Sequence, residues 1–429
     1  MNMPSIVRLL ALIPSLMLVQ CALPPKVQIS PPDIAKVSPK ANRDVSPYAV
    51  KKKLFVFLDG TNNQWDSRTN VRRLFETIAA REDPSLVCCY INGVGTGSSL
   101  TLRIKGLIFG EGMMARILEG YSFLSRHYQA GDEIYIFGFS RGALQARALA
   151  GLVSFSGLLP ADHSGSSREL QRVWDYCRHV EETKVSSAEW VKAVNSRTPP
   201  CPLYMKNQAP VHGRYAEIQF LGVWDTVPGS QLKEYGRYQE SNDDRKEGTR
   251  YKIGAYPPIK QVAHAMSIDE RRSEFKAVQV DPRYSRIVPG RKLEEVWFPG
   301  VHSDVGGGYD DANALAGVSM NWMIERLNAA AHFRSPLVRV YQDVRAPQHE
   351  SFDDFPGNLL SHSEPRSIPK GAIIDQASVD LRKKATGLYI RQKTRKGQHC
   401  SEFELLGKYD PVSLRPENRP VLPPLQPLR

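Results

Sequence analysis

The chain has 429 residues, of which 41% are hydrophobic and 24% are charged. This composition is that of an ordinary globular protein, and the length accommodates one large domain with extensions. The formal net charge of +12 favours anionic partners such as lipid surfaces. The basic residues are scattered, and no zinc-finger spacing, basic heptad region or aromatic RNA-binding signature is present. We therefore expect no nucleic-acid partner.

Residues 1–21 have the pattern of an export signal, because Arg8 precedes a short apolar run, Leu9–Val19. The run is shorter than the ~20 residues that a transmembrane helix needs. It leads into Leu-Val-Gln-Cys, which resembles a bacterial lipoprotein box with Cys21 as the lipidated residue. Gln20 stands where a small residue is usual, so a signal sequence without lipid attachment is the alternative. We expect the protein in the bacterial cell envelope, anchored to a membrane and facing the periplasm.

The next stretch, residues 22–50, is rich in Pro, Ser and Lys and has no periodicity, which predicts a disordered tether. We expect a catalytic domain over residues 51–345. Residues 346–429 form a C-terminal extension that ends in a proline-rich tail. The remaining cysteines contain no C-x-x-C pair or other metal-ligand spacing, and their disulfide connectivity stays open: Cys88, Cys89, Cys177, Cys201 and Cys400.

Three apolar runs in the first part of the domain predict buried strands. The first, Leu54–Leu58, ends at Asp-Gly-Thr, and the pattern recurs over Ser85–Gly95 and Asp132–Ser140. Between them, Val71–Arg81 and Met113–Tyr128 have apolar residues at helical spacing. The alternation of strand and helix predicts a mostly parallel sheet with helices on both faces.

The third run leads into the pentapeptide Gly138-Phe139-Ser140-Arg141-Gly142, which fits the G-x-S-x-G elbow. In this elbow, glycines allow a turn sharp enough to expose a serine Oγ. A helix-forming stretch follows and ends near Gly157, so Ser140 is predicted at a helix N-terminus. The alternative is a serine that only caps the helix.

Two later strands also end on polar residues. Ile218–Trp224 is followed by Asp225, and Val296–Phe298 is followed by His302. In a parallel sheet, catalytic groups gather at the carboxyl ends of strands. Four side chains fall there: Asp59, Ser140, Asp225 and His302. The order Ser, Asp, His is the order of α/β-hydrolases, so the predicted fold is an α/β-hydrolase-like, mostly parallel sheet.

Four separated stretches agree with one family: "FVFLDGTNNQW" with "TNVRRLF", "GFSRGALQAR", "GVWDTVPG", and "HAMSIDERRSEF" with "VWFPGVHSDVGGGY". On these motifs the chain resembles the DUF2235 family, the α/β-hydrolase domain of Tle1-type phospholipase effectors of bacterial type VI secretion. The resemblance implies a serine hydrolase of the phospholipase A type, acting on a phospholipid or another ester lipid. The export signal departs from injected effectors and favours a relative placed at an envelope membrane.

A catalytic role for Ser140 requires a base, because a neutral hydroxyl is a weak nucleophile. Two histidines lie in the family motifs. His302 is the predicted base, since it follows the last clear strand and enters a glycine-rich loop, and His264, before a charge-rich and helix-like stretch, is the alternative. Asp225 is predicted to orient the imidazole. Its alternative is Asp304, which would otherwise cap the loop through backbone amides.

The oxyanion of the transition state needs about two N–H donors, each worth ~3 kcal/mol. The backbone amide of Arg141 is the first predicted donor. The loop at Gly60 and Thr61 is the source of the second, with Asp59 shaping that loop, unless Asp59 and Gly60 form only a tight turn.

Two other classes of function stay open. A metal-dependent phosphoester hydrolase would use the Asp and His residues above as ligands, with Asp304 among them. The second is a catalytically inactive envelope lipoprotein that binds lipid or a partner. The serine mechanism requires no cofactor.

Overall fold

A computed structural model describes residues 51–60, 67–93, 112–180, 184–228, 251–309, 313–351, 362–386, 388–392, 402–405 and 408–421. Its centre is a seven-stranded sheet in the order β10-β8-β7-β6-β3-β1-β2. Every pair of neighbouring strands in this sheet is parallel. The strands are β1 (Lys53–Leu58), β2 (Leu86–Ile91), β3 (Glu133–Phe139), β6 (Ile218–Trp224), β7 (Gln261–Ser267), β8 (Lys292–Phe298) and β10 (Ile373–Ile374). The predicted parallel sheet is confirmed.

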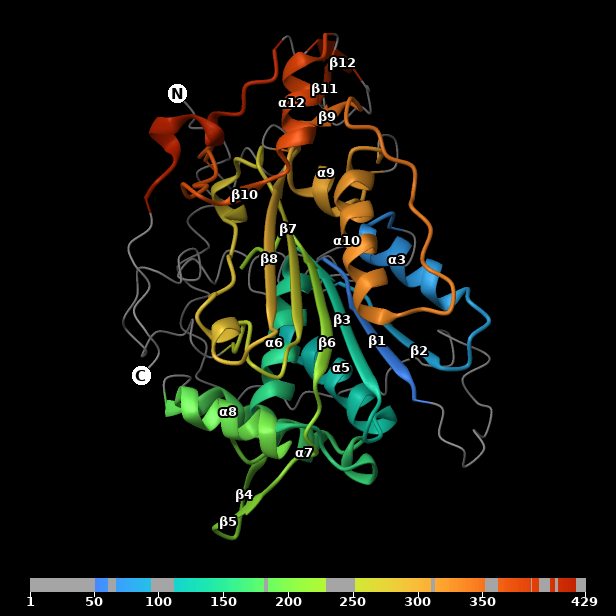
Figure 1. Ribbon diagram of the computed structural model, residues 1–429, viewed down its shortest axis with the longest axis vertical. Helices are drawn as coiled ribbons and strands as arrows, with labels where there is room; N and C mark the ends of the chain where they lie inside the picture. The colour runs from blue at the N-terminus through green and yellow to red at the C-terminus, as the bar shows by residue number, and fades with distance from the viewer. Residues whose placement is uncertain are drawn as a thin grey trace, which may run out of the picture.

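Helices cover both faces of this sheet (Figure 1). On one face lie α5 (Met113–His127) and α6 (Arg141–Ser156), with α7 (Ser167–His179) and α8 (Ser187–Ser196) beyond them. On the other face lie α3 (Asn70–Ala79) and α10 (Ala316–Ala331). This arrangement confirms the predicted helices on both faces.

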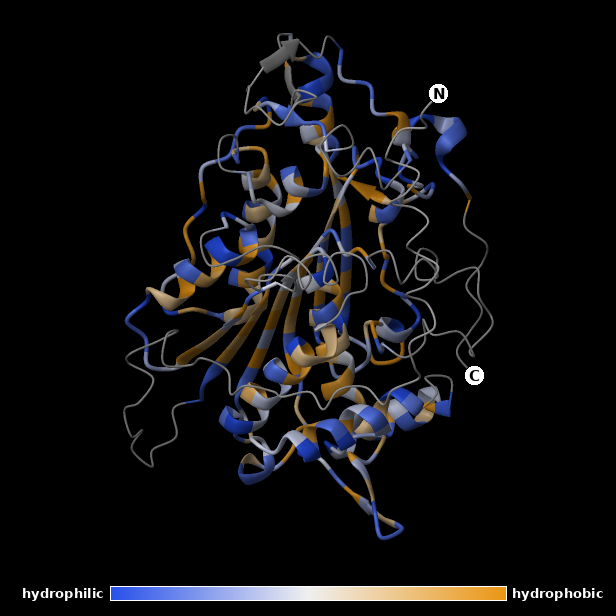
Figure 2. Ribbon diagram, turned by 180° about the vertical axis from the view of Figure 1, so that it is seen from behind, coloured by the Kyte–Doolittle hydropathy of each residue, from blue (hydrophilic) through white to orange (hydrophobic). Residues whose placement is uncertain are grey.

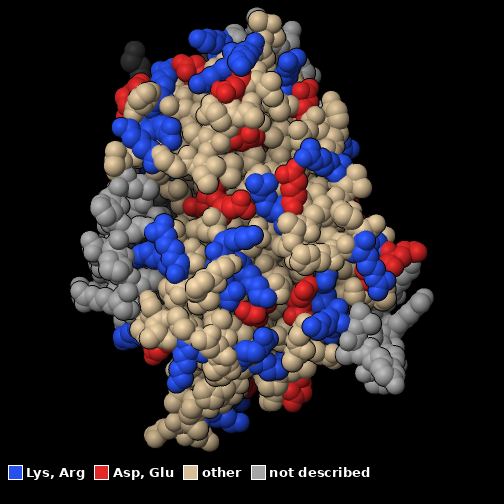
Figure 3. Space-filling view, viewed as in Figure 1, with Lys and Arg blue, Asp and Glu red and all other residues tan. Residues whose placement is uncertain are grey.

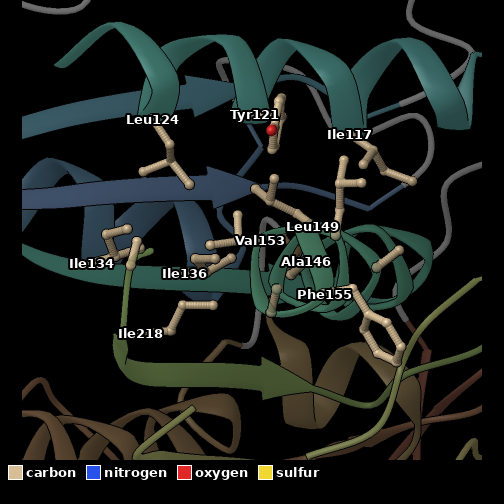
Figure 4. Packing of buried hydrophobic residues seen from close by; sticks show 14 of the residues in the cluster. Ile117, Tyr121, Leu124, Ile134, Ile136, Ala146, Leu149, Val153, Phe155 and Ile218 are labelled. Carbon is tan, nitrogen blue, oxygen red and sulfur yellow. The ribbon is translucent and has the colours of Figure 1, made fainter. Parts of the chain in front are cut away.

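The two-sided cover explains why the strands are continuous apolar runs. In β1, Leu54 and Val56 belong to the cluster under α5 and α6, whereas Phe55 and Phe57 belong to the cluster under α3 and α10. The strands are accordingly hydrophobic along most of their length (Figure 2). Figure 4 shows side chains of α5 and α6, such as Ile117 and Leu149, packed together near Ile136 of β3. These contacts fix the position of α6, whose first turn follows Ser140.

The charge-rich stretch after His264 does not form the helix that we expected. His264 lies inside β7, between β6 and β8, and its side chain is buried. The residues that follow contain one short 3-10 turn, Ser273–Phe275. Their charges have partners without a solvated helix face, because Glu270 binds Arg272 and Arg271 binds Glu350 of the C-terminal extension.

The C-terminal extension packs on the sheet through a third apolar cluster. In this cluster, Met266 of β7 and Trp297 of β8 meet Ile368 and Val379. The short strand β10 extends the sheet beside β8. The extension also contains α12 (Gln376–Lys384) and a small sheet of β9 (Gln348–His349), β11 (Tyr389–Gln392) and β12 (Glu402–Leu405).

The remaining elements are the hairpin of β4 (Tyr204–Lys206) and β5 (Ala209–Val211) and the short helix α9 (His302–Gly306). No helix among the described residues has the length and apolar character that crossing a membrane requires. On the face shown in Figure 3, Lys and Arg side chains are interspersed with Asp and Glu. The predicted signal, Cys21, the tether and the last eight residues, 422–429, lie outside the described residues.

Candidate active site

Ser140 occupies a strained turn between β3 and α6. Its backbone angles are φ 60° and ψ −127°, a conformation that non-glycine residues seldom adopt. The flanking glycines make this turn possible, because a Cβ at Gly138 would lie 2.4 Å from the carbonyl oxygen of Gly142. A Cβ at Gly142 would lie 2.3 Å from the carbonyl oxygen of Leu58. Both glycines of the elbow are therefore required by close backbone contact.

Asp225 lies at the end of β6, the strand next to β3, and the two strand ends are joined where the Ser140 N–H donates to the Trp224 carbonyl oxygen at 3.0 Å. The Asp225 side chain is fully buried. It accepts hydrogen bonds from the N–H of Ser267 at 3.0 Å and from both terminal nitrogens of Arg366 at 2.9 Å. Burial alone would raise the pKa of Asp225, but Arg366 and His302 outweigh burial and hold the pKa well below its ordinary value. The carboxyl group is therefore ionised.

His302 begins α9 and pairs with Asp225. Its Nδ1 lies 2.5 Å from Asp225 Oδ2, so Nδ1 donates and Nε2 is the nitrogen that can accept a proton. The imidazole packs against the ring of Phe139, the residue before Ser140, at 4.6 Å between centroids, and against Phe275 at 4.9 Å. Burial lowers the pKa of His302 and outweighs the raising effect of Asp225. The imidazole is neutral at neutral pH, as a general base must be.

The two alternative residues have other partners. His264 is buried in β7, where Nδ1 lies 2.8 Å from Glu295 Oε1 and Nε2 accepts from the N–H of Thr226 at 3.2 Å. Both of its ring nitrogens are thus engaged within the sheet. Burial is the main cause that lowers the pKa of His264.

Asp304 pairs with His349, a residue that was not predicted from the sequence to belong to the site. Asp304 Oδ1 lies 2.6 Å from His349 Nδ1, and Oδ2 accepts from the backbone N–H groups of His349 and Val301. Asp304 therefore has the loop-capping geometry that we gave as its alternative role. The ring of Tyr309 stacks on His349 at 3.5 Å between centroids.

The loop after β1 is organised by Asp59. Its carboxylate accepts from the hydroxyls of Thr69 and Tyr90, each at 2.6 Å, and from the N–H of Gly60 at 2.7 Å. The Gly60 amide is thus directed to Asp59, contrary to our expectation that it serves as an oxyanion donor. Thr61 lies outside the described residues. Arg141 is the first residue of α6, which places its amide at the positive end of the helix.

The residues that attach the His302 loop to the rest of the molecule were not predicted from the sequence. Asn70, at the start of α3, donates to the carbonyl oxygens of Val305 in α9 and Ala316 in α10. Glu270 Oε2 accepts from the backbone N–H of His302 at 3.3 Å. The motif "TNVRRLF" was a signal for Asn70, whereas Arg366 lies in a segment without any recognised motif.

The Asp and His residues do not form a metal-binding cluster. Asp225 pairs with His302, Asp304 pairs with His349, and Asp59 binds hydroxyl groups. Within the described ranges, no group of three or more His, Cys, Asp or Glu side chains is placed to hold a metal ion. The metal-dependent alternative therefore lacks the ligand set that it assumed among these residues.

A parallel sheet of this order, with a serine on a strained strand-to-helix turn beside an aspartate–histidine pair, defines the class of α/β hydrolases. The class has many functions, so the fold alone does not identify one. A model of the family described as "T6SS, Phospholipase effector Tle1-like, catalytic domain" matches residues 52–326, more than half of the chain. The protein belongs to this family.

Known proteins resemble parts of the chain. It is 26% identical over 254 residues to the uncharacterized protein YEL023C of Saccharomyces cerevisiae, a match that covers 54% of this chain and 33% of the yeast protein. An uncharacterized protein from Pseudomonas aeruginosa has 18% identity and a TM-score of 0.38, with 67% of this chain and 46% of that chain covered. The Tle1 effector bound to the VgrG spike of the type 6 secretion system has 19% identity and a TM-score of 0.29, with 61% and 52% covered. The chain thus spans less than two thirds of each of these proteins.

Proposed function

We propose that the protein is a serine hydrolase that cleaves carboxylic esters of membrane lipids, with phospholipase A-type activity. The observation that carries this proposal is the hydrogen bond between His302 Nδ1 and Asp225 Oδ2, beside the strained turn at Ser140. Membership of the Tle1-like phospholipase effector family supports lipid as the substrate class.

In the proposed reaction, Ser140 Oγ attacks the ester carbonyl while His302 Nε2 takes the hydroxyl proton. Asp225 holds the imidazole in the tautomer with a proton on Nδ1 and stabilises the imidazolium that forms. The backbone amide of Arg141, at the start of α6, donates to the oxyanion. His302 then protonates the leaving alcohol. Water next attacks the acyl-enzyme while His302 takes its proton, and His302 returns that proton to Ser140 Oγ as the fatty acid leaves.

A fluorophosphonate probe tests the nucleophile directly. We expect covalent labelling of the peptide that contains Ser140 in the wild type and no labelling of that peptide in Ser140→Ala. Ser154→Ala is the matched control, because Ser154 is a buried serine of the same helix whose hydroxyl donates to the Ala150 carbonyl. Equal labelling of wild type and folded Ser140→Ala would exclude the serine mechanism.

Mixed phospholipid vesicles test the substrate class. We expect the purified wild type to release fatty acid and lysophospholipid, which mass spectrometry of the lipids identifies together with the cleaved position. Ser140→Ala is expected to release neither product. Fatty acid release that Ser140→Ala retains would point to a contaminating or different activity.

The location at an envelope membrane is part of the same proposal. Lipid attachment at Cys21 and the tether of residues 22–50 would keep the enzyme near its substrate, and the net charge of +12 would add attraction to anionic head groups. Metabolic labelling with an alkyne fatty acid is expected to mark the wild type and not Cys21→Ser. Equal labelling of the two proteins would contradict the anchor.

A further inference from the structure

Arg366 reaches the site from a segment beyond the region that the family model matches. The segment is attached to the loop after β7 by backbone hydrogen bonds in antiparallel register. The Ser273 N–H donates to the His362 carbonyl oxygen at 3.0 Å, and the Glu364 N–H donates to the Arg271 carbonyl oxygen at 2.7 Å. Arg366 is therefore placed by backbone pairing and not only by its own side chain.

The guanidinium of Arg366 binds Asp225 as a fork. Its two terminal nitrogens lie 2.9 Å from Oδ1 and 2.9 Å from Oδ2, and both side chains are buried. Two parallel charge-assisted hydrogen bonds fix the plane of a carboxylate as well as its position. The same Oδ2 accepts the hydrogen bond of His302, so the plane that Arg366 fixes is the plane that orients the imidazole.

The charges around His302 are balanced while the imidazole is neutral. Three charged groups act on it directly, namely Asp225 after β6 and Glu270 and Arg272 after β7, and a fourth, Arg366 from the extension, is bound to Asp225. Arg272 is committed to Glu270, with two nitrogens at 2.9 and 2.8 Å from its carboxylate oxygens. Arg366 is thus the cation that balances Asp225, and its loss would leave one uncompensated negative charge beside the imidazole.

We propose that Arg366 is a positioning residue for hydrolysis, acting through Asp225: it fixes the carboxylate that orients His302 and, by balancing the charge of Asp225, limits how far that carboxylate favours the imidazolium. This inference rests on the proposed function for its effect on rate. An uncompensated Asp225 would favour the imidazolium, which cannot accept the proton of Ser140. The resting base would then be available only at higher pH.

The pH dependence of kcat/KM for a soluble ester substrate tests the inference. For Arg366→Met we expect the acid limb to move up by about one pH unit, because the cation that is hydrogen-bonded to Asp225, the partner of His302, is removed. We expect kcat on the plateau to fall about ten- to a hundredfold, as for a misplaced catalytic group. Arg366→Lys retains the charge without the fork, so its acid limb is expected near that of the wild type while kcat falls about tenfold.

Arg382→Met is the matched control. Arg382 is a second buried arginine of the extension, but it donates to the carbonyl oxygens of Val344 and Ala346 and not to Asp225. A purely structural role for buried arginines would give the same loss of stability in both methionine variants and leave both acid limbs in place. An unmoved acid limb in Arg366→Met, or a wild-type kcat in Arg366→Lys, would overturn the inference. If Arg366→Met does not fold, the kcat of Arg366→Lys decides.

A measurement that needs no substrate, the NMR titration of His302, separates this inference from the proposed function. The downfield NMR signal of the His302 Nδ1 proton reports titration of the imidazole, and we expect its midpoint to rise in Arg366→Met and to stay in Arg382→Met. A midpoint that rises while the wild type shows no Ser140-dependent hydrolysis would refute the proposed function and sustain the coupling. A midpoint that does not rise would refute the coupling even in an active enzyme.

Discussion

Replacing Ser140 by glycine is expected to stabilise the protein while it abolishes activity. The turn at Ser140 has φ 60° and ψ −127°. A residue with a Cβ in such a region costs of order 1–3 kcal/mol. Glycine avoids this cost, but it makes the unfolded chain more flexible, and this lowers the free energy of unfolding by about 0.5–1 kcal/mol relative to alanine. We therefore expect Ser140→Gly to be about 1 kcal/mol more stable than Ser140→Ala, which keeps the Cβ and, like glycine, lacks the hydroxyl.

A control inside the same helix gives the opposite sign. Ser154 lies in the regular part of α6, where glycine costs about 1 kcal/mol relative to alanine. Urea unfolding of the four variants, followed by circular dichroism, should rank Ser140→Gly above Ser140→Ala and Ser154→Gly below Ser154→Ala. If glycine is the less stable residue at both positions, the turn at Ser140 stores no strain and the reasoning is wrong.

Three further predictions concern the neighbouring groups. His302→Ala should lower kcat by at least about 10⁴-fold, whereas His264→Gln should change kcat per folded molecule less than about tenfold; the reverse result would make His264 the base. Burial raises the pKa of Asp269 to about 6, above its unfolded value, so its contribution to stability declines as pH rises from about 4 to about 6. Asp269→Asn should lack this decline, so its melting temperature should exceed that of the wild type at pH 8 but not at pH 4. The same difference in melting temperature at both pH values would contradict a raised pKa for Asp269. Incubation with EDTA should leave ester hydrolysis unchanged, and inactivation reversed by added metal would restore the metal-dependent alternative.

The core of the fold could be predicted because its signals are local. Each strand from β1 to β3 is a short apolar run, and the helices between them have apolar residues at helical spacing. The strand β7 was missed because its sequence, "QVAHAMS", contains a histidine and leads into a charge-rich stretch. That histidine is tolerated in the sheet because Glu295 on β8 and the Thr226 amide bind its ring nitrogens. Such pairing depends on the register of neighbouring strands, which a single sequence does not define.

The residues of the candidate site likewise divide into those that local sequence predicts and those that depend on distant contacts. Ser140, Asp225 and His302 could be placed at strand ends from their own neighbours in the sequence. The pairing of Asp225 with His302 was predicted, with Asp304 as the alternative, but the partner of Asp304 was not, since it depends on which loops meet above the sheet. His349 and Arg366 come from the extension, which has no motif, and they meet Asp304 and Asp225 only after the extension packs on β8.

The two residues of the Arg366–Asp225 contact are synthesised at different times. Arg366 follows Asp225 by 141 residues in the chain. At the usual ~5–20 residues per second of translation, roughly ten seconds pass between the emergence of the carboxylate and that of its arginine. During this interval a nascent chain contains the serine elbow with an acid that lacks its partner. Contacts over such long separations also form late in folding. We therefore expect full catalytic power to appear only after Arg366 has been synthesised and its segment has paired with the loop after β7.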